Sequence, residues 1–185
     1  MSDPIAVQTP LTEQAVLKLR AGDEVRITGT LYTGRDAAHK RLQDAIERGE
    51  DLPMPLAGSI IYYCGPAPAP PGKAFGSAGP TTSYRMDAFA PQLHALGLRA
   101  TVGKGDRSLE VRRACVQHRA VYLVATGGAG ALLADRVKAA RVIAYDDLGP
   151  EAIHELQVED FPAIVAYDAT GGSVFPGDAP LEDVA

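Results

Sequence analysis

The segment LRATVGKGDRSLEVRRACVQHRAVYLVATGGAGALLADRVKAARVIAY, residues 98–145, alternates short apolar runs with amphipathic stretches. The apolar runs predict three strands, at residues 98–102, 121–126 and 141–145. The amphipathic stretches between them predict two helices, over residues 108–118 and 129–137. Strands that are joined through a helix pair in parallel, so this segment predicts consecutive βαβ units.

The flanking sequence predicts a mixed sheet around these units. Further strands are expected at residues 24–33, 58–63, 161–167 and 173–175, and further helices at residues 12–20 and 36–48. The last two strands flank Asp-Ala-Thr-Gly-Gly, a hairpin signal, so we expect this closing pair and the opening strands to be antiparallel. The fold class is therefore α/β, a single mixed-sheet domain over residues 11–178. Residues 1–10 are expected to form a flexible lead-in, and residues 179–185 a C-terminal tail.

The composition is that of an ordinary globular protein. Of 185 residues, 46% are hydrophobic and 22% charged, which excludes disordered and fibrous classes. Lys and Arg number 18 against 23 Asp and Glu, a net charge of −5 without a basic stripe, so we expect no nucleic-acid partner. The longest uncharged stretch, residues 52–72, holds six prolines and three glycines and cannot form a membrane helix. The N-terminal residues do not resemble a secretory signal, so we expect a cytoplasmic protein.

Three glycine-bearing loops lie between a predicted strand and the helix or turn that follows. They are residues 76–85 (GSAGPTTSYR), 103–105 (GKG) and 127–130 (GGAG). A helix that begins at such a junction directs free N–H groups and a partial positive charge outward, which favours an anion. Glycine also serves in ordinary tight turns, so the argument depends on the cations nearby.

Three cations lie at such junctions. Arg35 starts a predicted helix, Arg85 follows a Thr-Thr-Ser run, and Lys104 lies in the Gly-Lys-Gly turn. The helix macrodipole destabilises a cation at a helix N-terminus by roughly 0.3–1 kcal/mol. Three cations in this unfavourable position therefore indicate a shared anion site, where a bound anion would offset the cost. An arginine guanidinium group binds a carboxylate through two parallel hydrogen bonds, so two arginines suit a dicarboxylate. The alternative is that each arginine pairs with a neighbouring carboxylate, Asp36 or Asp87.

Nucleotide-binding patterns match the sequence only in part. Position 98 is Leu where a P-loop requires Gly, and position 105 is Gly where it requires Ser or Thr. A dinucleotide pattern that starts at Gly128-x-Gly130 meets Leu133 in place of its third glycine. Asp146 lies near the distance that this pattern requires, so nucleotide binding remains a weaker alternative.

Histidine and cysteine offer little catalytic chemistry in this sequence. The histidines are isolated or lie near apolar helical faces: His39, His94, His118 and His154. Cys64 ends a buried strand and Cys115 lies on an apolar helical face, so both are expected in the core. Two cysteines are too few for a metal centre held by three or four thiolates. We therefore expect no metal site within this chain.

Longer motifs resemble a known family. The segments TGTLYTGRDAAHKR (28–41), IYYCGPAPAPPG (61–72) and GSAGPTTSYRMD (76–87) are similar to the β subunit of class I fumarate hydratase. The same family includes the β subunit of L(+)-tartrate dehydratase. The resemblance covers about residues 20–175. It continues through the Gly-Lys-Gly turn, the Gly-Gly-Ala-Gly loop and the segment VEDFP (158–162).

The resemblance implies a fold, a partner and a cofactor. The fold would be a swivelling β/β/α domain. It would work with an α subunit that carries a [4Fe–4S] cluster on three cysteines, so this chain would contribute no metal ligand. An α2β2 assembly would then bring two copies of this chain together. The implied substrate is a small dicarboxylate.

The resemblance also implies a set of site residues. Arg35, Arg85 and Lys104 would form a clamp for the substrate carboxylate, and Thr81 would be the base as well as a substrate contact. A hydroxyl is a poor base unless its alkoxide is stabilised, for which nearby cations and a helix N-terminus are the available means. The alternative is that Thr81 or Thr82 caps a helix.

The expected reaction is the reversible hydration of fumarate to L-malate, with this chain inactive on its own. Gly34 replaces the Ala that is common in the family, and Tyr84 stands where many fumarases have Gly and tartrate dehydratases a bulkier residue. Tyr84 therefore leaves L(+)-tartrate dehydratase as an alternative within the same chemistry. A non-catalytic carboxylate-binding module is the alternative of another class.

Overall fold

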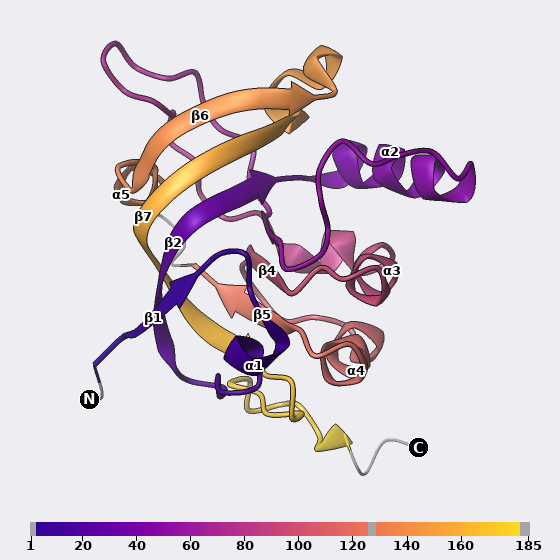
Figure 1. The fold of residues 1–185 in the computed structure, drawn as a ribbon. Coiled ribbons are helices and arrows are strands. Elements are labelled where there is room, and N and C mark those ends of the chain that lie inside the picture. Colours follow the sequence, from indigo (N-terminus) through magenta and orange to yellow (C-terminus); the bar gives the residue numbers. More distant parts are fainter. Residues whose placement is uncertain (1–2, 126–128, 182–185) are drawn as a thin grey trace.

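A computed structural model describes residues 3–125 and 129–181 (Figure 1). Within these residues a mixed sheet of seven strands is surrounded by helices. The elements are β1 (Ile5–Gln8), α1 (Glu13–Val16), β2 (Glu24–Thr33), α2 (Asp36–Glu47), β3 (Ile60–Tyr62), η1 (Ser83–Met86), α3 (Ala90–Ala95), β4 (Ala100–Gly103), α4 (Leu109–Gln117), β5 (Val121–Val124), α5 (Gly130–Ala134), β6 (Val137–Ala144), η2 (Asp146–Glu151) and β7 (Ile153–Tyr167).

The strand order is β1-β2-β3-β4-β5-β7-β6. Neighbours from β1 to β5 are parallel, whereas β7 is antiparallel to β5 and β6. The long strand β7 also pairs antiparallel with β2, from Glu24 opposite Ile164 to Tyr32 opposite Glu155. Because β7 pairs with both β2 and β5, the strands β2, β3, β4, β5 and β7 close into a ring (Figure 1).

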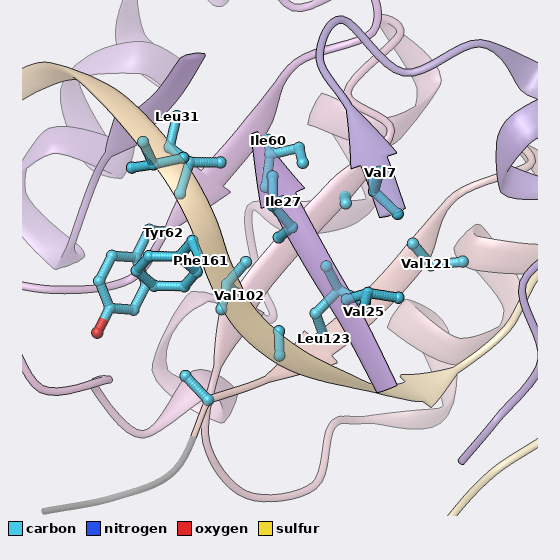
Figure 2. Packing of buried hydrophobic residues seen from close by; sticks show 14 of the residues in the cluster. Val7, Val25, Ile27, Leu31, Ile60, Tyr62, Val102, Val121, Leu123 and Phe161 are labelled. Carbon is cyan, nitrogen blue, oxygen red and sulfur yellow. The ribbon is translucent and has the colours of Figure 1, made fainter. Parts of the chain in front are cut away.

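The main hydrophobic core fills this ring. Figure 2 shows side chains from several strands pointing toward one another, among them Ile27, Ile60, Val102, Leu123 and Phe161. All five are at most 1% exposed. Fully burying one such side chain contributes roughly 1.5–3 kcal/mol, so the ring is stabilised chiefly by its interior.

Strand β3 is buried on both faces. Ile60 and Tyr62 point into the ring, and the alternate residues Ile61 and Tyr63 join a second cluster that includes residues of α2 and α3. Successive side chains of a strand point to opposite faces, so a strand covered on both sides must be apolar throughout. This explains the continuous apolar run that predicted β3.

Several predicted elements are confirmed. The strand at 24–33 and the helix beginning at residue 36 are β2 and α2, and the βαβ stretch is present as β4, α4 and β5. The prediction of a mixed α/β fold is likewise confirmed. Across the described residues, no helix combines the length and apolar character needed to cross a membrane.

The opening of the chain differs from its expectation. Residues 5–8, within the expected lead-in, form β1, in which Val7 alone is buried. One buried side chain gives almost no sequence signal. The prediction of antiparallel opening strands was wrong: β1, β2 and β3 are parallel because α1 and α2 lie in the connections between them. The expected helix over 12–20 is the short α1.

The end of the chain also differs. The expected helix over 129–137 stops at Ala134, and β6 already begins at Val137. It pairs antiparallel with β7, which starts at Ile153 rather than residue 161. The expected closing hairpin is reduced, in the part of the chain that is described, to a single bridge between Tyr167 and Ser173.

Candidate functional site

The four predicted site residues lie at one edge of the sheet. Strands β2, β3 and β4 are parallel neighbours, so their carboxyl ends meet at that edge. Arg35 follows β2, and Lys104 follows β4 directly. The loop after β3 returns to the same edge, where the Thr81 N–H donates to the Tyr63 carbonyl at 2.6 Å. Arg85 comes four residues later in η1.

Arg35 occupies the N-cap position of α2, with extended backbone and no capping side-chain bond. Its Nε is buried without a hydrogen-bond partner and lies 4.0 Å from Oε1 of Glu151. A Cβ at Gly65 would lie 2.8 Å from the Arg35 Nη1, so the glycine makes room for the guanidinium. A buried donor without a partner is costly, and an anion at this helix N-terminus would satisfy it.

Arg85 is paired with Asp36, the first residue of α2. Its Nε donates to Asp36 Oδ1 at 2.9 Å, and the Arg85 side chain is 44% exposed. An ion pair this exposed contributes at most about 1 kcal/mol. The alternative interpretation of the sequence was that each arginine pairs with a neighbouring carboxylate. Arg85 does pair with a carboxylate, but this is Asp36 and not the adjacent Asp87, which pairs with Arg107. The pair connects η1 to the helix that Arg35 precedes.

Backbone bonds join the Thr81 loop to the Lys104 turn. Thr82 and Lys104 form a parallel bridge, the Lys104 N–H donates to the Thr81 carbonyl at 3.3 Å, and the Ser83 N–H donates to the Lys104 carbonyl at 2.9 Å. Thr81 is half-buried and Lys104 exposed. Thr82 is the N-cap residue of η1, but its side chain makes no capping bond. The capping alternative thus gains no support at Thr82.

The Gly-Lys-Gly motif has a steric explanation. A Cβ on Gly103 would lie 1.8 Å from Ser83 Oγ, which no side chain tolerates. Gly105 has a φ of +80°, in the left-handed region that favours glycine. Lys104 therefore stands between two positions that only glycine fills well.

A buried arginine behind the site was not found from the sequence. The side chain of Arg107 is 0% exposed. Its Nε donates to Asp87 Oδ1 at 2.5 Å, and its Nη2 donates to the Tyr63 hydroxyl at 3.3 Å. Asp87 Oδ2 accepts from the Ser108 N–H at 2.6 Å, where α4 begins. Asp87 thus links η1 to the segment after Lys104. Nothing in the sequence separates a buried arginine from the many that lie at surfaces.

The third glycine loop is described only in part. Gly127 and Gly128, the latter the first glycine of the dinucleotide pattern, lie outside the described residues. A Cβ on Gly130 would lie 2.8 Å from the Gly79 nitrogen and from Ser77 Oγ. The described end of this loop therefore packs closely against the segment that leads to Thr81.

His94 and both cysteines are core residues, as expected, and His39, which was expected to be isolated, is buried as well. His39 and His94 bond through Nδ1 to the carbonyls of Arg35 and Leu98, and burial lowers the pKa of each to about 4. Burial raises the pKa of the Cys115 thiol to about 12 and that of Cys64 still further. Within residues 3–125 and 129–181, no group of three or more His, Cys, Asp or Glu is placed to hold a metal ion.

A cavity of about 380 Å³ lies beside the site edge and is not part of it. It is lined by the Pro-Ala loop, β6 and the segment before β7, together with Phe75 and His154, whose rings are in edge contact. Arg35, Thr81, Arg85 and Lys104 do not line it. The four residues instead lie on an open edge, which suits a site that another chain or domain completes.

Comparison with known proteins gives a consistent result. Residues 2–177 match the family model described as "Fumarase C-terminus". The chain is 39% identical over 175 residues to "Fumarate hydratase class I, aerobic" of Salmonella typhimurium, covering 92% of this chain and 30% of that protein. It is 43% identical over 151 residues to the Escherichia coli K12 protein of the same name, covering 80% of this chain and 28% of that protein.

A third relative has a similar length. The chain is 41% identical over 171 residues to a protein of Methanocaldococcus jannaschii assigned as L(+)-tartrate dehydratase subunit beta. The match covers 89% of this chain and 88% of that protein. The chain therefore spans about a third of the class I fumarate hydratases and nearly all of the separate subunit.

Proposed function

Because the chain belongs to the fumarase C-terminus family, we propose that it is the substrate-clamping β subunit of an iron–sulfur hydro-lyase that interconverts fumarate and L-malate. The observation that carries this proposal is the meeting of Arg35, Thr81, Arg85 and Lys104 at the carboxyl ends of β2, β3 and β4. Three cations gathered at one edge of the sheet suit a small dianionic substrate.

In this proposal, Arg35, Arg85 and Lys104 bind one substrate carboxylate. When the proton leaves the carbon next to that carboxylate, negative charge moves onto its oxygens as an enediolate. Fixed cations stabilise this charge more strongly than they stabilise the ground state, which lowers the barrier. Thr81 takes the proton, and the same cations stabilise the alkoxide that the reaction requires.

The residues of this chain do not fit a cluster held on three thiolates. The sequence contains two cysteines, and they lie in different hydrophobic clusters, Cys64 inside the ring and Cys115 on α4. Both are buried as neutral thiols. We therefore place the [4Fe–4S] cluster of the proposal on an α subunit. The swivelling of this domain against that subunit, and an α2β2 assembly, are parts of the same proposal.

L(+)-tartrate dehydratase is the second candidate. The observation that favours it is the M. jannaschii relative, which matches this chain along 88% of its length. Fumarate remains our first choice because, in the described part of the three glycine loops, no side chain other than Tyr84 is dedicated to a second hydroxyl. Tyr84, the residue singled out for that role, is 64% exposed in the isolated chain.

Reconstitution tests the proposed function. We expect the purified chain to contain no iron and to show no fumarate hydration, and we expect co-expression with a cluster-bearing partner to supply both. Iron content, absorbance and malate formation measure the outcome. Iron–sulfur absorbance and turnover by the lone chain would contradict the proposal. Binding of fumarate to the complex without turnover would favour the carboxylate-binding module instead.

Substrate choice is tested through Tyr84. We expect the assembled enzyme to prefer L-malate to L(+)-tartrate in kcat/KM, and Tyr84→Gly to keep this order. A site built to bind the second hydroxyl of tartrate would reject malate by about 10⁴–10⁵-fold, because its own polar groups would be left unpaired. A wild-type preference for tartrate that collapses in Tyr84→Gly would identify Tyr84 as the selector and overturn our choice.

A further inference from the structure

Tyr122 carries a hydroxyl deep inside the protein, next to the site. The residue lies on β5, beyond β4 in the sheet, and is fully buried. Its hydroxyl is 2.8 Å from the Gly105 carbonyl and 2.8 Å from Ser83 Oγ. Burying a hydroxyl is costly unless it is hydrogen-bonded, and Phe would fill the same space without that cost. These two bonds are therefore what the hydroxyl provides.

The hydrogen bonds form one consistent chain that ends on Lys104. Each hydroxyl has one proton. Tyr122 donates to the Gly105 carbonyl, and Ser83 donates to the Tyr122 oxygen. Ser83 Oγ is then free to accept from the Lys104 N–H, at 3.1 Å. The Lys104 N–H is thus bonded to Ser83, and the carbonyl of the next residue, Gly105, is bonded to Tyr122.

The tyrosine itself cannot easily move. The Arg107 guanidinium lies 4.8 Å from the centre of the Tyr122 ring and 5.2 Å from that of Tyr63. A cation over an aromatic face is attracted to it, and Asp87 fixes that cation in place. The Tyr122 hydroxyl is therefore presented to the Lys104 turn from a rigid base.

We propose that Tyr122 and Ser83 are positioning residues that act on the substrate clamp through the backbone of Lys104. This inference rests on the proposed function, because it assigns these two hydroxyls a purpose in binding the carboxylate. Neither residue touches the substrate. They hold the Lys104 backbone, and with it the base of the Lys104 side chain, beside the Thr81 loop.

The first test is kinetic. In the assembled enzyme, Tyr122→Phe and Ser83→Ala are expected to raise KM for L-malate and to lower kcat/KM by about 10- to 100-fold, since misplacing a group by about 1 Å costs on the order of 10² in rate. Tyr167→Phe is the matched control. Tyr167 is likewise buried, in the same aromatic cluster, and its hydroxyl accepts a hydrogen bond from the backbone N–H of Arg107 at 3.2 Å. This control should lose stability but keep KM.

A double-mutant cycle shows whether the effect passes through Lys104. In a Lys104→Met enzyme, adding Tyr122→Phe should reduce kcat/KM no further, because the group being positioned is already absent.

In the isolated chain, Ser83→Ala should speed hydrogen exchange of the Lys104 amide, measured by NMR. Losses that add in the cycle, or a Tyr167→Phe loss equal to that of Tyr122→Phe, would overturn this inference alone. A wild-type complex that turns over no dicarboxylate would overturn the proposed function and this inference with it.

Discussion

Replacing Thr81 by Ala in the assembled enzyme is expected to lower kcat for L-malate by roughly 10²-fold or more, the usual contribution of a positioned proton-transfer group. The backbone of Thr81 is bonded to Tyr63 on one side and to Lys104 on the other, so the substitution should leave the loop in place. Because binding rests on the cations, KM should change far less than kcat. Steady-state kinetics in both reaction directions measure the split.

Thr82→Ala is the matched control for this experiment. Thr82 is also half-buried and also bridges to Lys104 through its backbone, but its side chain makes no capping bond. Thr82→Ala should therefore retain near-normal kcat, and Thr81→Ser should recover much of the activity because it restores the hydroxyl. Near-normal kcat in Thr81→Ala would reduce this residue to a structural role and remove the base from the proposal.

Replacing Asp87 by Ala is expected to lower the free energy of unfolding by about 3–5 kcal/mol, the usual cost of removing one partner from a buried ion pair. The Arg107 side chain is 0% exposed, so its charge would lose its carboxylate without gaining water. The Ser108 N–H at the start of α4 would also lose its acceptor. Urea denaturation of the isolated chain measures the change.

Asp147→Ala provides the comparison. Asp147 pairs with Arg41, but its side chain is 64% exposed, so the pair should contribute no more than about 1 kcal/mol. Equal decreases in the free energy of unfolding of the two variants would contradict the expectation that the buried ion pair matters more than the exposed one. Asp87→Ala combined with Arg107→Leu should lose less than Asp87→Ala alone, because the uncompensated charge is then gone.

Local signals in the sequence were sufficient for part of the fold. The alternation in β2, the helix that follows it and the two-sided apolar run of β3 were predicted correctly because each pattern reflects the burial of its own residues. Strand direction was predicted wrongly, because β1 carries too little signal to be recognised as a strand and the helix expected over 36–48 was not taken as a crossover between parallel strands. Only the second half of β6 was predicted, as the strand at 141–145. Its first half was missed because β6 lies at a sheet edge, where Val137 is its one buried residue.

The candidate site divides in the same way. Arg35, Arg85 and Lys104 could be proposed from the sequence because cations beside glycine loops are locally unusual. Ser83 and Tyr122 were missed because their bond joins residues 39 positions apart and depends on β4 and β5 being neighbours in the sheet. A tyrosine inside an apolar strand gives no sign, in sequence, of what its hydroxyl will meet.

The ring of strands has a consequence for biosynthesis. Strand β2 emerges early from the ribosome but lacks its antiparallel partner until β7 has been made, more than 100 residues later. Pairings of such high sequence separation slow folding, because loop-closure entropy is lost before the contacts form. An unpaired β2 edge therefore stays exposed for most of translation, when nascent chains are most prone to aggregate. Synonymous codon changes that slow synthesis between α2 and β7 should consequently reduce soluble yield without altering the finished protein.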